Sequence, residues 1–351
     1  MTGQPLPAYR RIMEYIREEI KNGNYSPGDR IPSENELARM FGVSRLTARR
    51  AIEKLADEGL LVRIPGLGTF VSSISKEESV TYVGVAIDDL LDTRGRTMIF
   101  GITETLRNLS MYAILSSANT KGTEHLVRKL KEFLEEDVKG LIISPFPELM
   151  ERGILDVYIK RGIPIVFIDR SVRGWEGKIP VVESDNRTGG KLLGEHLRKK
   201  HGLKKALFVA NEGFDISSVR DRYEGFTEGF KGHVDSVVAS LEDIKKLLPR
   251  MIKDEGYEAI FFCHDLLAIA GLTTLLKSGI MVPEEVKIVS FDDRILSKFP
   301  SPKLTTVRQD FEEMGKTAAL FLVKRIRGEE IPERTLIPVE LIVRESCGCR
   351  R

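Results

Sequence analysis

Several acidic and basic residues directly follow short apolar segments, where they could hold a small polar molecule. They are Asp88, Asp89, Asp169, Arg170 and Asp292. A carboxylate accepts hydrogen bonds from two hydroxyl groups at once, and a guanidinium donates several. The carboxyl ends of parallel strands form one edge of a sheet, so these residues predict a cleft for a polyhydroxylated ligand. A turn or a helix cap is the simpler interpretation of each Asp taken alone.

A second group of residues could contact DNA. Arg45 and Arg49 lie one helical turn apart at the start of an expected helix, with Thr47 between them and Ser44 as a potential cap. This end of a helix-turn-helix enters the major groove, where an Arg can make a bidentate contact with guanine. Such basic residues can also form a merely solvated helix face.

The elements around these arginines favour DNA binding. Helical periodicity covers residues 9–22, a Ser-Glu capping box opens a helix over residues 33–41, and the third helix ends at Gly59. Two strand-like segments then flank a glycine-rich turn at residues 65–68. Three helices and a hairpin predict a winged helix-turn-helix over residues 1–71.

The cysteines and histidines have spacings that do not suggest metal binding. Cys347 and Cys349 lack a second ligand pair nearby, and His196 and His201 are five residues apart instead of four. No metal site is therefore expected. The run Cys-His-Asp at residues 263–265 makes a poor catalytic triad, because neighbouring strand residues point to opposite sides.

The rest of the chain alternates short apolar strands with amphipathic helices. This alternation predicts an α/β fold with doubly wound parallel sheets. A serine-rich linker at residues 72–79 separates it from the head. No glycine-rich fingerprint follows the first strand and no phosphate-binding loop is present, so no cofactor and no catalytic residue are expected. A Rossmann-like enzyme remains a distant alternative.

The net charge, the lack of long apolar stretches and the number of cysteines limit the classes of protein to which this chain can belong. The 351 residues carry 54 Lys and Arg against 52 Asp and Glu, so any nucleic-acid function must be local. No apolar stretch is long enough to span a membrane, and no signal peptide is recognisable at the first residues. Three cysteines cannot all be paired in disulfides. We expect a cytoplasmic protein without a membrane partner.

Two families resemble different parts of the chain. The segments IPSENEL at residues 31–37 and FGVSRLTARRA at residues 41–51 resemble the GntR-type winged helix of bacterial regulators. The remainder resembles the two-lobed sugar-binding domain of the LacI family, which is similar to type I periplasmic binding proteins. The segments that carry this second resemblance are residues 140–144, 163–170, 185–186, 222–226, 290–293 and 304–309. The combination of both parts resembles bacterial arabinose repressors.

The resemblance implies a set of binding residues. The implied DNA contacts are Ser44, Arg45, Thr47, Arg49, Asn35 and, at the tip of the wing, Gly66. The implied ligand contacts are Asp88, Asp169, Ser218, Arg222, His264, Asp292 and Gln309, beside Asp89 and Arg170 at the strand ends. The sugar-binding domain, residues 80–347, would divide into lobe 1 at about 80–181 and 311–335 and lobe 2 at about 182–308 and 336–347.

The implied function is a repressor that binds a palindromic operator as a homodimer and is released by L-arabinose. Two-fold symmetry of the protein would match two half-sites on double-stranded DNA. Ligand binding would close the lobes and act on the heads through the linker. From the residues alone, the effector is a small polyhydroxylated molecule, so another sugar or a purine-like metabolite stays open.

Overall fold

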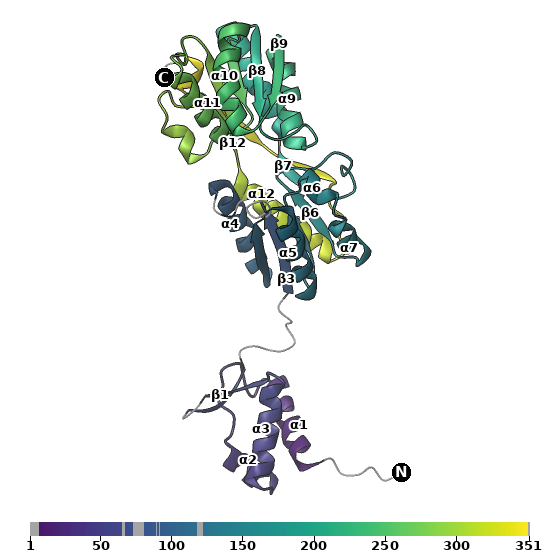
Figure 1. The fold of residues 1–351 in the computed structure, drawn as a ribbon. Coiled ribbons are helices and arrows are strands. Elements are labelled where there is room, and N and C mark those ends of the chain that lie inside the picture. The colour runs from purple at the N-terminus through teal and green to yellow at the C-terminus, as the bar shows by residue number, and fades with distance from the viewer. Residues whose placement is uncertain are drawn as a thin grey trace. The chain divides into compact units, whose positions relative to one another are not determined.

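The computed structural model describes residues 7–64, 67–72, 81–88, 90, 92–117 and 122–349. It divides into two compact units, Met1–Val80 and Thr81–Arg351, which we call the head and the sensor (Figure 1). Gly66, Asp89 and residues 73–79 of the expected linker lie outside the described residues. Within the described ranges, no helix has the length and apolar character needed to cross a membrane.

The head contains the expected helices and hairpin. Its elements are α1 (Ala8–Lys21), α2 (Glu34–Phe41), α3 (Arg45–Asp57) and the antiparallel pair β1 (Leu61–Ile64) and β2 (Gly68–Val71). Apolar residues spaced three or four apart on the helices meet in one core, where Ile12, Ile16, Leu37, Ile52 and Leu55 are fully buried. The predicted winged helix-turn-helix is therefore confirmed.

Local interactions fix the ends of the two central helices of the head. Ser33 Oγ accepts from the Glu36 N–H, and a Glu36 carboxylate oxygen accepts from the Ser33 N–H, which completes the predicted capping box. Gly42 ends α2 with φ of 63°, a backbone conformation that favours glycine. Two residues later, Ser44 caps α3, so the turn places the start of α3 directly after α2.

The sensor contains two sheets, each at the centre of one lobe (Figure 1). The lobe 1 sheet has the order β13-β7-β6-β5-β3-β4, and all its neighbouring strands are parallel. Its strands are β3 (Thr81–Ile87), β4 (Met111–Ser117), β5 (Leu141–Ile143), β6 (Ile165–Ile168), β7 (Val181–Ser184) and β13 (Arg334–Ile337).

The lobe 2 sheet has the order β14-β12-β11-β10-β8-β9 and is parallel except for the antiparallel pairing of β14 with β12. Its strands are β8 (Lys205–Ala210), β9 (His233–Val238), β10 (Ala259–Phe262), β11 (Lys287–Asp292), β12 (Thr305–Gln309) and β14 (Val339–Ile342). The predicted two-lobed α/β fold of parallel sheets is thus confirmed, with this one antiparallel edge.

Helices cover both faces of the lobe 1 sheet. Val83 and Val85 of β3 face a core shared with α4 (Thr93–Arg107) and α12 (Phe311–Ile326). Ala86, on the opposite side of the same strand, faces the core of α5 (Thr123–Glu135), α6 (Pro147–Met150) and α7 (Ile154–Lys160). Lobe 2 carries α8 (Asn186–His201), α9 (Ser217–Phe230), α10 (Leu241–Glu255) and α11 (Asp265–Lys277), with the short 3-10 helices η1 (Ile295–Lys298) and η2 (Glu345–Cys347).

The chain passes between the two sheets near Asp185, Asp310 and Pro338, within the described residues. The second passage coincides with the expected one. The first and third lie slightly later in the sequence, because β7 and β13 pair with each other in the lobe 1 sheet. Each passage directly precedes or follows a strand end, so opening of the lobes would bend the chain close to the candidate ligand site.

Helices α8 and α9 approach each other closely because glycine lies at their contact. A Cβ atom on Gly225 would lie 2.0 Å from the Arg187 carbonyl oxygen, and one on Gly190 would lie 2.3 Å from the Arg222 carbonyl oxygen. Only a residue without a side chain allows these distances. This close packing brings Arg222 of α9 beside Asn186 at the start of α8.

Candidate DNA interface and ligand cleft

The start of α3 is held in place by its capping residues. Ser44 Oγ accepts from the Thr47 N–H at 3.2 Å and lies 2.8 Å from the Thr47 hydroxyl oxygen. Arg45 and Arg49 follow on an exposed face, and their side chains are 68% and 53% exposed. A capped helix start with exposed arginines on its surface is the arrangement by which helix-turn-helix proteins contact base edges.

Carboxylates hold both arginines in the isolated head. Arg45 Nε lies 3.0 Å from a Glu34 oxygen, and Arg63 of the hairpin lies 2.7 Å from the other oxygen of the same carboxylate. Arg49 pairs with Glu53 one turn further along α3 at 2.8 Å. Exposed pairs of this kind contribute little to stability, so DNA phosphates can compete for these arginines at small cost.

A groove of about 440 Å³ lies between the start of α2, the start of α3 and the hairpin. Asn35, Arg45 and Arg63 line it, together with Arg30. Neither Arg63 nor Arg30 was predicted from the sequence. Arg63 lies in β1, and Arg30 lies between α1 and α2, where its backbone pairs with Phe70 of β2. Leu46, which is 74% exposed on α3, was not predicted either. Gly66 lies outside the described residues.

In lobe 1 the strand-end residues form one buried ion-pair network. Arg170, after β6, lies 2.9 Å from an Asp88 oxygen and 2.8 Å from an Asp169 oxygen. The burial of Asp169 alone would raise its pKa, but Arg170 and Arg94 favour the carboxylate and hold the pKa at about 2. The structure thus joins three of the predicted ligand residues, whereas Asp89 is outside the described residues.

In lobe 2 a second network forms around Asp292 at the end of β11. Gln309 Nε2 donates to one Asp292 oxygen at 2.6 Å, and Arg294 Nε donates to the other at 2.8 Å. Arg222 lies with a guanidinium nitrogen 3.7 Å from Asp292. It also donates to Asn186 Oδ1 at 2.8 Å and to the Cys263 carbonyl oxygen at 2.6 Å.

Arg222 is therefore a scaffold residue as much as a ligand candidate. Its side chain is 7% exposed, and its guanidinium carbon lies 4.0 Å from the centre of the Phe291 ring. It holds α9 against α8 and against the end of β10 through Asn186 and Cys263. Ser218 is buried one turn earlier on α9.

His264 caps α11 with its ring. The Leu267 N–H donates to His264 Nδ1 at 3.2 Å, so Nε2 carries the ring hydrogen and donates to Asn211 Oδ1 at 2.9 Å. Burial lowers the pKa of His264 to about 4 and keeps the ring neutral near pH 7. Both ring nitrogens of His264 thus have partners in the protein, Nδ1 as the helix cap and Nε2 through Asn211.

Two buried acceptors in these networks have no hydrogen-bond partner among the described residues. They are Asp169 Oδ1 in lobe 1 and Gln309 Oε1 in lobe 2. An unsatisfied buried acceptor costs about 1–3 kcal/mol, so both atoms favour a ligand that brings O–H or N–H donors. A cavity of about 440 Å³ is lined in part by Arg94, Asp292 and Gln309.

Arg94 is a further candidate ligand-site residue that was not predicted from the sequence. It lies in the first turn of α4, and its side chain is 16% exposed. Its nearest carboxylate oxygens, on Asp88, Asp92 and Asp169, are 3.4–3.7 Å away, which is longer than a good charge-assisted hydrogen bond. Its N–H groups can therefore still donate to a ligand.

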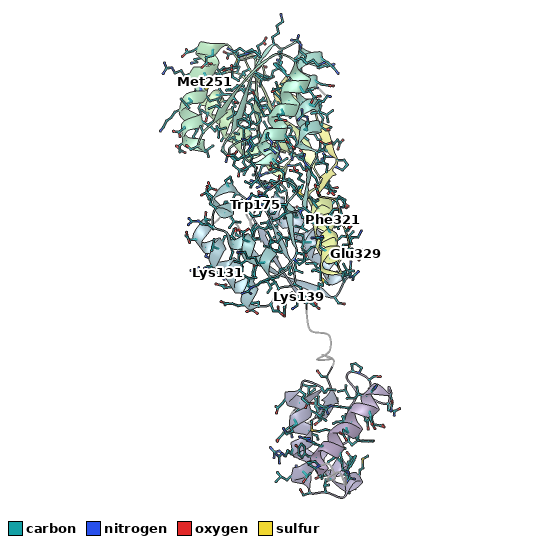
Figure 2. The ribbon with its side chains drawn as sticks, turned by 90° about the vertical axis from the view of Figure 1, so that its right-hand side faces the viewer. Lys131, Lys139, Trp175, Met251, Phe321 and Glu329 are labelled. Atoms are coloured by element: carbon teal, nitrogen blue, oxygen red, sulfur yellow. The ribbon has the colours of Figure 1, made fainter. Side chains whose placement is uncertain are left out.

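Ion pairs also connect the two lobes across the cleft. Arg170 of lobe 1 lies 2.8 Å from Glu212 of lobe 2, and Arg294 of lobe 2 lies 2.9 Å from Asp92 of lobe 1. The backbone bridges the lobes as well, because Val172 pairs with a residue just before α9. Trp175, labelled in Figure 2, lies in the same loop and packs on the lobe 1 core. The Lys178 Nζ atom lies 5.3 Å from the centre of its ring.

A winged helix-turn-helix head joined to a two-lobed binding domain defines a ligand-responsive transcription regulator. Residues 8–71 match the family described as bacterial regulatory proteins, gntR family, and residues 195–347 match a periplasmic binding protein-like domain. The chain is 30% identical to the arabinose metabolism transcriptional repressor of Geobacillus stearothermophilus, over 99% of both chains. It is 27% identical to the protein of the same name from Halalkalibacterium halodurans, over 92% of this chain and 90% of that one.

Solved structures agree in fold. The complex of the transcriptional regulator CelR with cellobiose superimposes with a TM-score of 0.67 at 22% identity, over 90% of this chain and 100% of that chain. The full-length similarity shows that the chain belongs to the family of the arabinose metabolism transcriptional repressors. It is a transcriptional repressor and not an enzyme, so the Rossmann-like enzyme considered from the sequence is excluded.

Proposed function

We propose that this repressor binds a two-fold-symmetric operator as a homodimer and that L-arabinose in the sensor cleft releases it. One small head offers few DNA contacts, and two heads related by two-fold symmetry would match two half-sites. The choice of sugar rests on the names of the full-length relatives. Another monosaccharide or a purine-like metabolite is the alternative.

The unpartnered acceptors are the observation that carries the ligand proposal. Asp169 Oδ1 and Gln309 Oε1 come from different lobes, and both can accept from sugar hydroxyl groups. Arg94, with its long ion pairs, supplies donors to the sugar oxygens. A polyhydroxylated molecule is a donor and an acceptor at neighbouring positions, and it would complete the hydrogen bonding of both lobes at once.

The same contacts give the ligand an effect on the relative position of the lobes. A sugar bound to Asp169 and Gln309 stabilises the arrangement in which Arg294 reaches Asp92. Ligand binding shifts a conformational equilibrium only as far as its affinity differs between the two states. By the same linkage, a sugar that weakens operator binding binds more weakly to the operator complex than to the free protein.

Fluorescence anisotropy on an operator selected from random duplexes tests this proposal. The full chain is bound to the labelled duplex and titrated with L-arabinose and with other pentoses and hexoses. Release by L-arabinose at concentrations where the other sugars leave the complex intact is the expected result. Release by a different sugar or by a purine would assign the effector to that class, and no saturable DNA binding at all would refute the proposal.

A further inference from the structure

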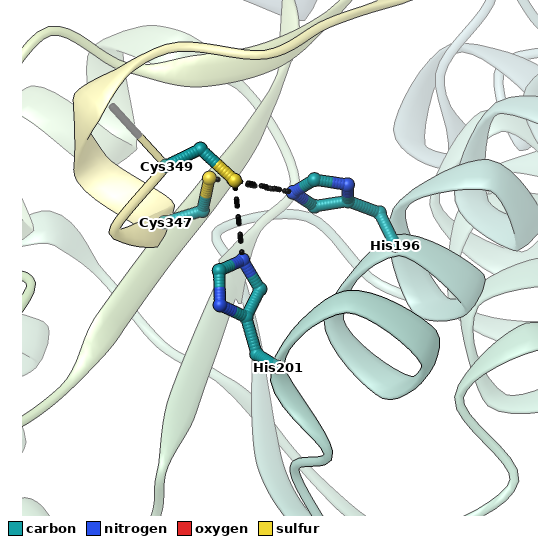
Figure 3. Close-up of side chains that lie close together, drawn as sticks. All are labelled: His196, His201, Cys347 and Cys349. Atoms are coloured by element: carbon teal, nitrogen blue, oxygen red, sulfur yellow. Dashed lines mark hydrogen bonds between the residues drawn. The ribbon is translucent and has the colours of Figure 1, made fainter. Parts of the chain in front are cut away.

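Two cysteines from the end of the chain lie against two histidines of α8 in lobe 2. Cys347 is in η2, Cys349 follows it, His196 lies in the second half of α8, and His201 is its last residue (Figure 3). The Sγ atom of each cysteine and one ring nitrogen of each histidine all lie within 4.8 Å of one another. The sequence spacing within each pair does not suggest metal binding, but the fold brings the two pairs together.

The distances match a tetrahedral metal site. Zinc lies about 2.3 Å from thiolate sulfur and about 2.0–2.1 Å from imidazole nitrogen, so a regular tetrahedron separates sulfur from nitrogen by about 3.6 Å. Here His196 Nε2 is 3.3 Å from Cys347 Sγ and 3.8 Å from Cys349 Sγ, and His201 Nε2 is 3.5 Å from Cys349 Sγ. One ion can therefore reach all four atoms after small side-chain adjustments.

The fold holds these ligands in position without the metal. Ser346, next to Cys347, is fully buried, and its hydroxyl donates to the Ile288 carbonyl oxygen at 2.7 Å. Thr305 donates its hydroxyl to Cys347 Sγ at 3.1 Å, as groups around structural metal sites orient the metal-binding sulfur. The segment around Ser346 and Cys347 is thus fixed to β11 and β12, and the sulfurs of Cys347 and Cys349 are directed at the histidines (Figure 3).

We propose that His196, His201, Cys347 and Cys349 bind one Zn²⁺ ion in a closed structural site. Two thiolates and two imidazoles are ligands that select zinc over the harder Mg²⁺ and Ca²⁺. Two thiolate charges neutralise the ion, so the site needs no further counter-charge. Four protein ligands leave no open position for catalysis, and the ion would fasten the end of the chain to α8.

This site would stabilise the lobe that carries half of the ligand cleft. Helix α8 begins at Asn186, which accepts from Arg222, and it ends at His201. A metal bond at one end of α8 therefore restrains the element whose other end borders the cleft. The proposal does not depend on the identity of the effector.

Metal content of the full chain is the first test. The protein is purified without a histidine tag, incubated with ZnCl₂, passed through a desalting column and analysed by mass spectrometry of the elements. We expect about one zinc per chain for a four-ligand site of this type. The variants Cys349→Ser and His201→Ala should lose most of it, and His233→Ala, which replaces an exposed histidine of the same lobe, should keep it.

Cobalt substitution provides a readout that does not require any variant to fold. Co²⁺ added to the metal-free wild-type chain should give the intense visible bands of a tetrahedral ion and a thiolate charge-transfer band, both removed by Zn²⁺. A chelator should also lower the melting temperature of the wild-type chain and leave that of Cys349→Ser unchanged.

Several results would overturn the proposal. These are a wild-type chain without stoichiometric zinc, equal zinc in the wild type and Cys349→Ser, or a cobalt spectrum without thiolate bands. A fourth is an intact mass two hydrogen atoms below that of the fully reduced chain, measured on protein isolated under reducing conditions. Such a mass would indicate a disulfide bond between Cys347 and Cys349 in place of a metal.

Discussion

Replacing Arg45 by alanine tests whether the start of α3 recognises bases. The Arg45 side chain is 68% exposed at the groove and pairs with Glu34 at 3.0 Å. Glu34 keeps a second partner in Arg63 at 2.7 Å, so its carboxylate is not left without a cation in the variant. The fold of the head should therefore be unaffected, and the change should act on DNA binding alone.

The expected loss of operator affinity depends on two free energies: that of the ion pair with Glu34, which Arg45 leaves on binding DNA, and that of the contact with guanine, which it gains. Leaving an exposed ion pair costs about 0–1 kcal/mol. A bidentate contact of Arg with guanine contributes about 1–3 kcal/mol of discrimination against other bases. The difference is about 0–3 kcal/mol, so at 1.4 kcal/mol for each factor of ten Arg45→Ala should bind the selected operator roughly tenfold more weakly, and at most about 150-fold.

Arg50→Ala is the matched control on the same helix. It removes the same charge, but the Arg50 guanidinium carbon lies 4.9 Å from the centre of the Tyr9 ring, on the side of α3 that faces α1. Anisotropy titrations at several salt concentrations, on the selected operator and on a scrambled duplex, separate the two contributions. We expect only Arg45→Ala to reduce the ratio of specific to non-specific affinity, and equal reductions in both variants would refute the base contact.

Three further changes address the sensor. Asp169→Asn should weaken sugar binding by about tenfold or more in calorimetry, because a hydrogen bond to a charged acceptor is worth about 1.5–3 kcal/mol, and unchanged affinity would contradict the assignment. Gly225→Ala places a Cβ atom 2.0 Å from a backbone oxygen of α8 and should lower the melting temperature by several degrees, whereas Gly213→Ala, with no atom within 4 Å of its Cβ, should not. Folding lowers the pKa of His264 from 6.5 to about 4, so as the pH falls the unfolded chain takes up this proton at a higher pH than the folded chain does. The free energy of unfolding should therefore decrease as the pH drops from about 6.5 to about 4. His264→Asn keeps a side-chain oxygen that can cap α11 and should reduce the pH dependence of the free energy of unfolding. Urea denaturation at a series of pH values measures this dependence, and an unchanged dependence in the variant would contradict the role of His264.

Most strands near the centre of each sheet and most of the long helices could be predicted from the sequence. β5, β6 and β10 are uniformly buried and apolar, so their segments stand out from their polar surroundings. The strands β7, β9, β12, β13 and β14 were not predicted. Of these, β9, β13 and β14 lie at sheet edges and consist mostly of exposed or partly buried residues. The inner strands β7 and β12 contain charged residues, Glu183 and Arg308, which interrupt their apolar pattern. Helix α10 was missed because Pro249 lies inside it and suggests a break.

The residues alone predicted site positions that follow a strand. Ser218, Arg222 and His264, which lie in or before helices, came only from the family resemblance. Asp88, Asp169 and Asp292 end strands, and the rule for parallel sheets places such residues at one edge. Arg94 and Asn186 lie in the first turns of α4 and α8, and nothing in their local sequence distinguishes them from other surface positions. Their role depends on which helix packs beside which strand, and a local pattern does not contain that information.

The chemistry across the cleft explains how a small ligand could move whole lobes. Arg170 meets Glu212 and Arg294 meets Asp92 through ion pairs that are largely buried on the arginine side. The desolvation of such pairs offsets most of their Coulomb attraction, so the arrangement in which the lobes meet through them gains little free energy from these pairs. When two arrangements of the lobes differ little in free energy, a ligand that adds two or three hydrogen bonds to one of them changes their populations substantially, because these bonds contribute a few kcal/mol. An apolar interface of the same size would hold the lobes together with or without the ligand, and the repressor would then lose its response.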